Sequence, residues 1–225
     1  MPNIDNIFND DPEDDPEDDP IQKDKSIVTA NLLTPSQKQT IKVLSTLFDQ
    51  ANFYICGGAA RQLYLNKDFG STDIDIFCKN KGDFVKLTKL LASNKIVDDA
   101  STYAISYLYK GLKLQIVKNN YNMSLCDVFQ DFDFTVCCFA FDRNYIYYSE
   151  SAIRDLDTKI IRLNTYYFRV YRLFKYMNKG FILSDELKDH LDKFMIKLII
   201  LKYIWDSYDN TEQYIKGMLA EVIWI

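Results

Sequence analysis

Hydrophobic residues recur with two different periods along this chain of 225 residues. Spacings of three and four positions predict helices, whereas alternation at every second position predicts strands. The first helix is expected to begin near Thr34, a good N-cap residue, with Pro35 at its first helical position. The two periods mix as far as residue 150, which predicts an α+β fold. Helical spacing covers residues 41–48, 59–65 and 84–91, and strand-like runs cover residues 53–56, 73–78, 103–109 and 112–117. Residues 134–141 and 145–148 are expected to be extended or buried.

The second part of the chain has a different pattern. From about residue 153 onward the spacing is helical. The most apolar window, residues 194–205, contains two lysines and is too short to span a bilayer, so it predicts a buried helix. We therefore divide the chain into a mixed α/β domain over residues 34–150 and an all-α domain over residues 151–225.

The N-terminal segment is set apart by its charge. Residues 1–25 hold ten acidic residues and two lysines, a net charge of −8, whereas the whole chain has a net charge of −5. The remainder therefore carries +3, which leaves a nucleic-acid partner open. Residues 11–20 repeat proline and acid with nothing apolar to bury, so residues 1–26 are expected to be disordered. This acidic tail is a solvated segment, a docking segment for a basic protein partner, or a nucleic-acid mimic.

The composition excludes several classes of site. The chain has one histidine, His190, so neither a histidine-rich metal site nor a His-based catalytic triad is expected. Five cysteines without C-x-x-C spacing indicate reduced thiols. The N-terminus has no basic region followed by an apolar stretch, so no signal peptide is expected. These features predict a cytoplasmic protein, in the host cytoplasm if the chain is viral, with no membrane partner.

The stretch that carries chemistry is residues 54–77, YICGGAARQLYLNKDFGSTDIDIF. Here a predicted strand ends at Gly57 and Gly58, and a helix begins at once. Glycine permits positive φ and close approach to the backbone, and the N–H groups at a helix N-terminus attract anions. Arg61 lies in the first turn of this helix, where it can contact a phosphate. The segment therefore predicts a phosphate-binding turn.

A pair of acidic residues follows about a dozen positions later. Asp73 and Asp75 are two apart on a predicted strand, so both carboxylates lie on one face, roughly 7 Å apart. Like charges this close repel each other unless a cation lies between them, and magnesium favours carboxylates together with phosphate oxygens. A phosphate-binding turn beside such a pair is suited to metal-assisted phosphoryl or nucleotidyl transfer.

With these residues the chain resembles the head domain of the DNA polymerase β-like nucleotidyltransferase superfamily. It is most similar to the class II CCA-adding enzymes and bacterial poly(A) polymerases, whose pattern is G-G-x-x-R at a helix start followed by D-x-D. The resemblance implies a nucleotidyltransferase-fold head, a small mixed sheet flanked by helices, followed by an all-α neck. It also implies that Gly57, Gly58 and Arg61 bind a nucleoside triphosphate. By the same resemblance, Asp73 and Asp75 hold Mg2+ in a two-metal site.

Two later stretches support the resemblance. Residues 131–142, DFDFTVCCFAFD, are similar to the motif R-R-D-F-T-x-N-A-L, which implies that Asp133 contacts the sugar or assists the metals. Residues 161–181 are similar to the neck motif, which implies that Arg169 and Arg172 face the nucleotide or primer. A helix here is expected to pack through its apolar side. That side holds Val170, Leu173, Phe174 and Met177.

Several positions depart from the family pattern. Asp131 and Phe132 stand where two basic residues precede D-F-T, and Cys137 stands where an asparagine follows it. Gln115 lies near the position of a further acid that is common in the family, and Gln62 replaces an aspartate. No clear E-D-x-x-R motif follows. The pair that binds metal is therefore kept, while much of the base-selecting apparatus differs.

Three functions remain in competition. The preferred one is a metal-dependent nucleotidyltransferase that adds nucleotides from a nucleoside triphosphate to an RNA 3′ end, as CCA-adding enzymes or poly(A) polymerases do. The second is a catalytically impaired head and neck that binds nucleotides or nucleic acid without turnover. The third is a structural interaction protein recruited through its acidic tail. Incorporation of labelled nucleotide into RNA, and its loss when Asp73 and Asp75 are replaced by alanine, would separate the first from the others.

Overall fold

A computed structural model describes residues 21–24, 33–69, 73–98, 102–118, 121, 123–165, 168–193 and 195–196. Its helices are α1 (Pro35–Phe48), α2 (Gly58–Tyr64), α3 (Lys81–Leu91), α4 (Leu125–Gln130), α5 (Glu150–Thr158) and α6 (Val170–Met177), with a 3-10 turn η3 (Thr135–Cys137). Its strands are β1 (Ile21–Asp24), β2 (Phe53–Cys56), β3 (Ile74–Cys78), β4 (Lys95–Asp98), β5 (Ala104–Tyr109), β6 (Leu112–Val117), β7 (Phe139–Phe141), β8 (Ile146–Ser149), β9 (Ile160–Ile161) and β10 (Ile182–Leu183).

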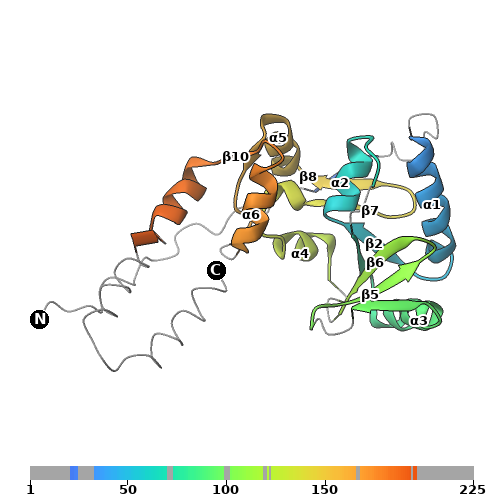
Figure 1. Cartoon of the computed structure of the whole chain (residues 1–225). Helices are drawn as coiled ribbons and strands as arrows, with labels where there is room; N and C mark the ends of the chain where they lie inside the picture. Colours follow the sequence, from blue (N-terminus) through green and yellow to red (C-terminus); the bar gives the residue numbers. More distant parts are fainter. Residues whose placement is uncertain are drawn as a thin grey trace, which may run out of the picture.

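The main sheet has eight strands in the order β1-β8-β7-β2-β3-β6-β5-β4. Strands β3 and β6 run parallel, and the other neighbours are antiparallel. In Figure 1, α1 and α3 lie on the right of the view, the central strands in the middle, and α5 and α6 on the left. This mixed sheet flanked by helices confirms the predicted α+β fold class.

Local sequence accounts for the ends of several elements. Thr34 caps α1 through a capping box, because its hydroxyl accepts from the Gln37 N–H while the Gln37 side chain accepts from the Thr34 N–H. Lys110 and Gly111 both have positive φ, 48° and 83°, and form the tight turn between β5 and β6. The predicted hairpin is therefore confirmed.

The core lies between the central strands and the helices that cover them. Leu44 and Leu47 of α1 and Leu87 of α3 are fully buried, as are Ile55 of β2 and Ile76 of β3. Burying side chains of this size contributes about 1.5–3 kcal/mol each. The core therefore fixes the two central strands, and with them the positions of Gly57 and Asp75 at their ends.

Two expectations about the chain's regions need correction. Ile21–Asp24, placed at the end of the disordered tail, form β1 and pair with β8, while residues 1–20 lie outside the described residues. The second domain is not all helix, because β9 and β10 form a parallel two-stranded sheet. Strands β1, β9 and β10 each pair with a strand that is distant in the sequence. Hydrophobic spacing along the chain gives no information about such pairing. Residues 194 and 197–205 of the predicted buried helix are not described, and its two described residues, Met195 and Ile196, are exposed.

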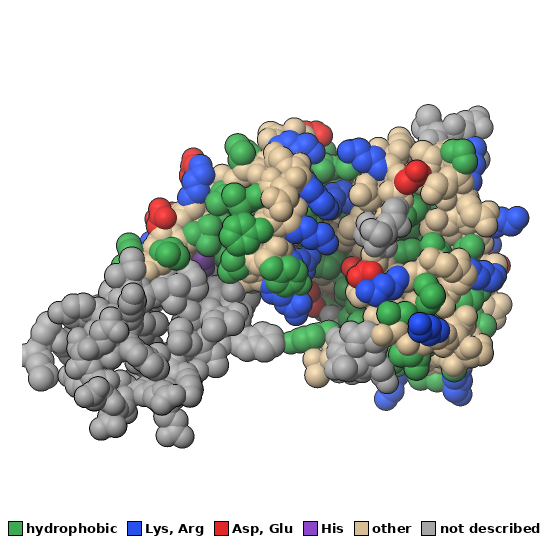
Figure 2. All heavy atoms as spheres, viewed as in Figure 1, with side chains coloured by type: hydrophobic (Ala, Val, Ile, Leu, Met, Phe, Trp, Pro, Cys, Tyr) green, Lys and Arg blue, Asp and Glu red, His purple; other side chains and the backbone are tan. Residues whose placement is uncertain are grey.

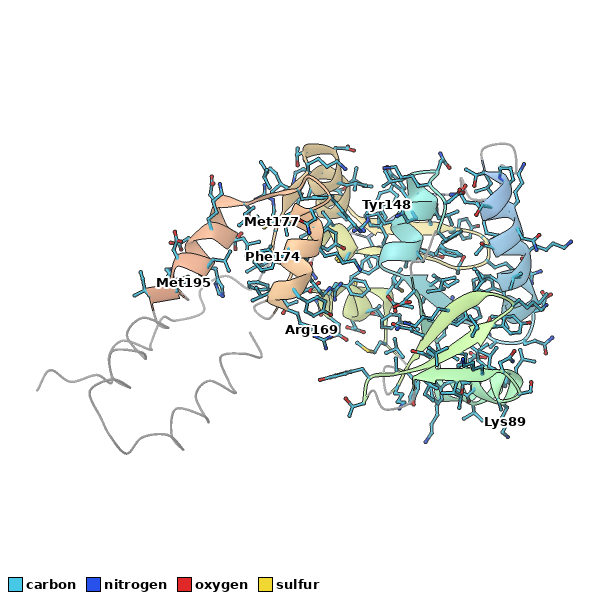
Figure 3. All side chains as sticks on the ribbon, viewed as in Figure 1. Lys89, Tyr148, Arg169, Phe174, Met177 and Met195 are labelled. Atoms are coloured by element: carbon cyan, nitrogen blue, oxygen red, sulfur yellow. The ribbon has the colours of Figure 1, made fainter. Side chains whose placement is uncertain are left out.

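Helix α6 packs through only part of the side expected, because Leu173 alone of its four predicted residues is buried. Its buried residues are Leu173 and Tyr176, whereas Phe174 is 58% exposed and Met177 is 41% exposed. Figure 3 shows both of these exposed residues on α6. Tyr176 displaces them from the interface because its ring packs on Phe134 and Phe181, and its hydroxyl finds buried polar partners.

Candidate active site

The predicted phosphate-binding turn lies where β2 passes into α2. Gly57 has a φ of +70°, which only glycine adopts freely, and its N–H donates to the Phe139 carbonyl at 2.7 Å. A Cβ added to Gly57 would lie 3.8 Å from Oδ2 of Asp75. The glycine therefore serves two purposes, since it permits the turn and leaves space beside a carboxylate. Gly58 begins α2.

The register of the sheet brings the two aspartates to this turn. Asp75 pairs with Cys56 on β2 and with Gln115 on β6, and Asp73 directly precedes β3. The Asp73 carboxylate forms an ion pair with Lys113, whose Nζ lies 3.1 Å from Oδ1. Gln115 Nε2 also donates to Asp73 Oδ2 at 3.2 Å. Gln115 therefore places an amide, not an acid, beside Asp73.

Asp75 has the more unusual environment of the pair. It is partly buried, and among the described residues no side chain donates a hydrogen bond to it. Burial, followed by repulsion from Asp73, raises its pKa from 3.8 to about 6, against the opposing effects of Arg172, Lys175 and Lys113. A cation between the two carboxylates would relieve this repulsion. The pair thus fits a divalent cation such as Mg2+.

Arg61 points toward the neck. Its guanidinium is 6% exposed, and Nη1 donates to the Val136 carbonyl at 2.9 Å and to the Tyr176 hydroxyl at 2.8 Å. It also lies over the Tyr176 ring, 5.0 Å from the centroid. These contacts tie α2 to α6, so only the remaining N–H groups of Arg61 are left for a phosphate. A role in triphosphate binding stays a prediction.

Asp133 and Arg172 meet across the boundary between head and neck. Arg172 Nε lies 3.1 Å from Asp133 Oδ2. Burial raises the pKa of Asp133, although Arg172 opposes the shift. Cys137 lies beside this pair, with its Sγ 3.0 Å from the Tyr176 hydroxyl and 3.6 Å from Arg172 Nη2. The structure thus joins Asp133, Arg172, Cys137, Tyr176 and Arg61 into one polar cluster, which we call the junction cluster.

Cations on α6 face the carboxylates of the sheet. Arg172 and Lys175 both act on Asp75 electrostatically, and Arg169, at the N-cap of α6, lies over the Tyr103 ring at 5.8 Å. Figure 2 shows Lys and Arg side chains gathered along the hollow between the part of the molecule that carries α6 and the part that carries the sheet. The positive charge predicted for the neck therefore borders the site, and Lys175 belongs to it.

The positions that depart from the family pattern have structural partners. Asp131 is the C-cap of α4, and the Phe132 ring packs on Phe77 at 6.1 Å. Gln62 Oε1 is buried without a hydrogen-bond partner in the described part of the chain. Phe132 is partly buried and packs against the core.

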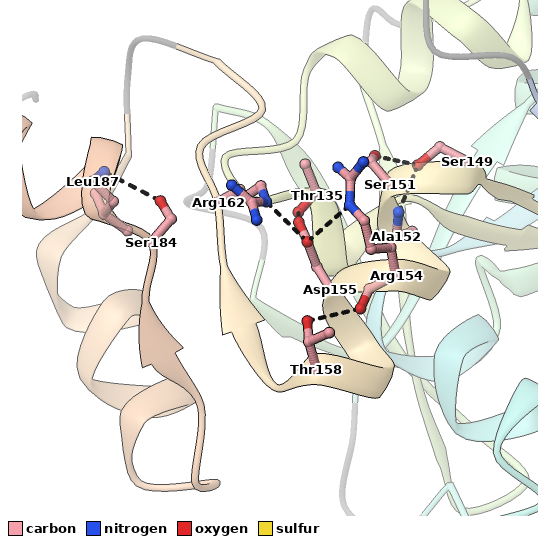
Figure 4. A network of polar contacts seen from close by, with 10 residues as sticks. All are labelled: Thr135, Ser149, Ser151, Ala152, Arg154, Asp155, Thr158, Arg162, Ser184 and Leu187. Carbon is pink, nitrogen blue, oxygen red and sulfur yellow. Dashed lines mark hydrogen bonds and ion pairs between the residues drawn. The ribbon is translucent and has the colours of Figure 1, made fainter.

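A second polar network, missed by the sequence analysis, holds the D-F-T segment. Asp155 on α5 is fully buried and accepts from the Thr135 hydroxyl at 2.7 Å and from Arg162 Nε at 3.0 Å. Arg154 adds a contact at 3.5 Å. Figure 4 shows these groups converging on the one carboxylate. The network fixes the turn that carries Thr135, and the helical spacing around Asp155 gave no sign of these distant partners.

The chemistry of the described residues limits what the site can hold. No group of three or more His, Cys, Asp or Glu side chains gathers there in metal-binding geometry. All five cysteines are free thiols, and Cys126 is exposed. In the described part of the chain, no helix is both long and apolar enough to cross a membrane. The arrangement can therefore bind a divalent cation through two carboxylates, beside a turn and a positive helix.

Solved structures of CCA-adding enzymes have a similar fold. The chain superimposes on the Thermotoga maritima CCA-adding enzyme complexed with tRNA with a TM-score of 0.56 and 17% identity, covering 77% of this chain and 45% of that one. A CCA-adding enzyme complexed with ATP gives 0.57 and 18%, covering 79% and 46%. The chain thus spans about half the length of these enzymes. It has a nucleotidyltransferase-like fold that resembles their head and neck.

The sequence relatives define a more particular family. A curated protein of Bacillus phage SPbetaL7, "Gabija anti-defense 2", is 29% identical over 170 residues, which cover 73% of this chain and 41% of that protein. The model of the Gabija anti-defense 2 family matches residues 25–159. The chain belongs to the Gabija anti-defense 2 family.

Proposed function

We propose that the protein is a metal-dependent nucleotidyltransferase that adds nucleotides from a nucleoside triphosphate to an RNA 3′ end. Its activity would serve the anti-defence role for which the family is named. The phage relative supports action in the cytoplasm of a host cell. The acidic residues 1–20 would provide a docking segment for a protein partner.

The observation that carries the proposal is the environment of Asp73 and Asp75. Asp73 lies just before β3 and Asp75 lies near its start, and Gly57 leaves space beside the Asp75 carboxylate. Repulsion and burial raise the pKa of Asp75 to about 6, which marks a carboxylate pair short of positive charge. A carboxylate pair placed for structural stability would have donors on both members. This one has them on Asp73 alone among the described residues.

The proposed reaction joins an acceptor hydroxyl to the α-phosphate. The 3′-hydroxyl oxygen attacks the α-phosphorus, the bond between the α-phosphorus and the bridging oxygen to the β-phosphate breaks, and pyrophosphate leaves. The hydroxyl proton passes to solvent. Bound Mg2+ supplies charge neutralisation at the phosphates.

The residues of the site would each have a separate role in this reaction. Asp73 and Asp75 hold the cation, and Gly57 and Gly58 place the turn against the β- and γ-phosphates. Arg172 holds Asp133 toward the site by the ion pair at 3.1 Å. Exposed cations on α6, Arg169 and Lys175, supply positive charge along the path of a phosphate backbone. These assignments follow the resemblance to enzymes solved with tRNA, ATP and CTP.

One observation favours a second candidate, a module that binds nucleotides without turnover. Gln115 stands opposite Asp75, and Arg61 Nη1 is engaged by Val136 and Tyr176. Both features reduce the number of charged groups available for chemistry. This candidate predicts triphosphate binding that no transfer follows.

A labelling experiment tests the proposal. The full chain is incubated with Mg2+, each labelled nucleoside triphosphate and a pool of short RNA and tRNA. Label joined to RNA is expected, and Asp73→Ala/Asp75→Ala should abolish it. Asp157→Ala, an exposed position on α5, is the matched control and should retain full transfer. Triphosphate binding without label transfer would favour the second candidate, and transfer that survives the double substitution would contradict the assignment of the site.

A further inference from the structure

The two aspartates of the site are not equivalent, because β6 supplies cationic and amide donors to one of them. Lys113 Nζ lies 3.1 Å from Asp73 Oδ1 and 3.3 Å from its Oδ2. Gln115 Nε2 lies 3.2 Å from the same Oδ2. Both oxygens of Asp73 therefore already face a donor, whereas Asp75 has none among the described side chains.

The strand geometry explains why these two donors act together. Lys113 and Gln115 are two apart on β6, so their side chains lie on the same face. Strand β6 runs parallel to β3 with Gln115 opposite Asp75, so that face is the one that carries the aspartates. The donors therefore belong to the site by register.

The charges limit how many cations the site can hold. Two carboxylates give −2, and Lys113 contributes +1 within contact distance of Asp73. One divalent cation brings the sum to +1, and a second would bring it to +3. A carboxylate at position 115 would have offset part of this positive charge, but the Gln115 amide is neutral and offsets none. No third carboxylate joins the pair in the described part of the chain.

We propose that the Lys113 ammonium takes the place of one divalent cation, so that the site holds a single divalent cation whose affinity is set by Lys113 and Gln115. The inference rests on the proposed function for the kind of site, and it narrows the two-metal expectation to one. Lys113 is a positioning residue in this scheme, since it acts by orienting and neutralising Asp73.

Manganese binding to the full chain without nucleotide tests the inference. Titration calorimetry and electron paramagnetic resonance of free Mn2+ give the affinity and the number of sites. Wild type is expected to bind one Mn2+, and Lys113→Met should bind it about tenfold more tightly because a nearby positive charge is gone. Lys113→Met/Gln115→Glu should bind two. Lys89→Met is the control, because it removes the same charge from an exposed position in the last turn of α3, a helix that carries none of the site residues.

The outcomes separate this inference from the proposed function. Two Mn2+ bound by wild type, or a Lys113→Met affinity equal to that of Lys89→Met, would overturn the inference and leave the proposed function standing. If neither wild type nor any variant binds Mn2+ in a way that depends on Asp75, the inference and the proposed function are both overturned. Lys113 is 40% exposed, so Lys113→Met is expected to fold, and melting followed by circular dichroism checks this for each variant.

Discussion

Two aspartates in this molecule, Asp75 and Asp155, show how differently one fold treats a carboxylate. Asp155 is fully buried, yet it accepts from Thr135 and Arg162 and lies near Arg154. Asp75 is only partly buried, yet burial and then repulsion from Asp73 raise its pKa. The more buried carboxylate therefore has more hydrogen-bond and ion-pair partners.

This difference separates a structural charge from a functional one. A buried charge survives in a fold when partners replace its hydration, as they do around Asp155. A charge left without partners lowers stability until a ligand supplies them, and such groups gather at functional sites. The network on α5 thus needs nothing further, whereas the pair at the start of β3 keeps a repulsion that the proposed cation would relieve.

The largest effect is expected at Asp155. Asp155→Ala leaves the Thr135 hydroxyl and the Arg162 guanidinium without their common acceptor, so it should lower the free energy of unfolding by about 3–5 kcal/mol. Urea denaturation measures this loss. Asp155→Asn keeps an acceptor oxygen and should lose less. An alanine variant as stable as wild type would mean that the network contributes nothing net.

Replacing Asp75 is expected to change the free energy of unfolding in the opposite direction. Its pKa is raised on folding, so the folded state binds a proton more tightly than the unfolded state. Stability from this group therefore falls as pH rises from about 4 to about 6, and the loss is constant above that range. At pH 7 and without divalent metal, Asp75→Asn should raise the free energy of unfolding by about 2 kcal/mol.

The pH series supplies the control for this prediction. Other groups titrate over the same range, so the quantity to follow is the difference between Asp75→Asn and wild type at each pH. This difference should shrink toward zero as pH falls from 7 to 4. Stabilisation by the asparagine that persists undiminished at pH 4 would exclude titration of Asp75 as its cause.

The comparison also shows what could be predicted from the sequence. Strands β2 and β6 begin and end where alternation and turn residues placed them, because both signals are local. The G-G-x-x-R and D-x-D patterns located Asp75 beside Gly57 for the same reason. The direction of Arg61 could not be predicted, since its partner Tyr176 lies 115 positions away. The alternation along β6 could have indicated Lys113, which shares a face with Gln115.

The smallest effect is expected on the neck, where only Leu173 of the predicted packing side is buried. Phe174 is 58% exposed, so Phe174→Ala should change the free energy of unfolding by less than about 0.5 kcal/mol. Leu173, one position earlier, is 3% exposed, and Leu173→Ala should cost about 2–5 kcal/mol because it leaves a cavity against the head. Urea denaturation of the two variants side by side measures the contrast. Equal losses would mean that the outer side of α6 is covered in solution, and that the helix packs through both sides.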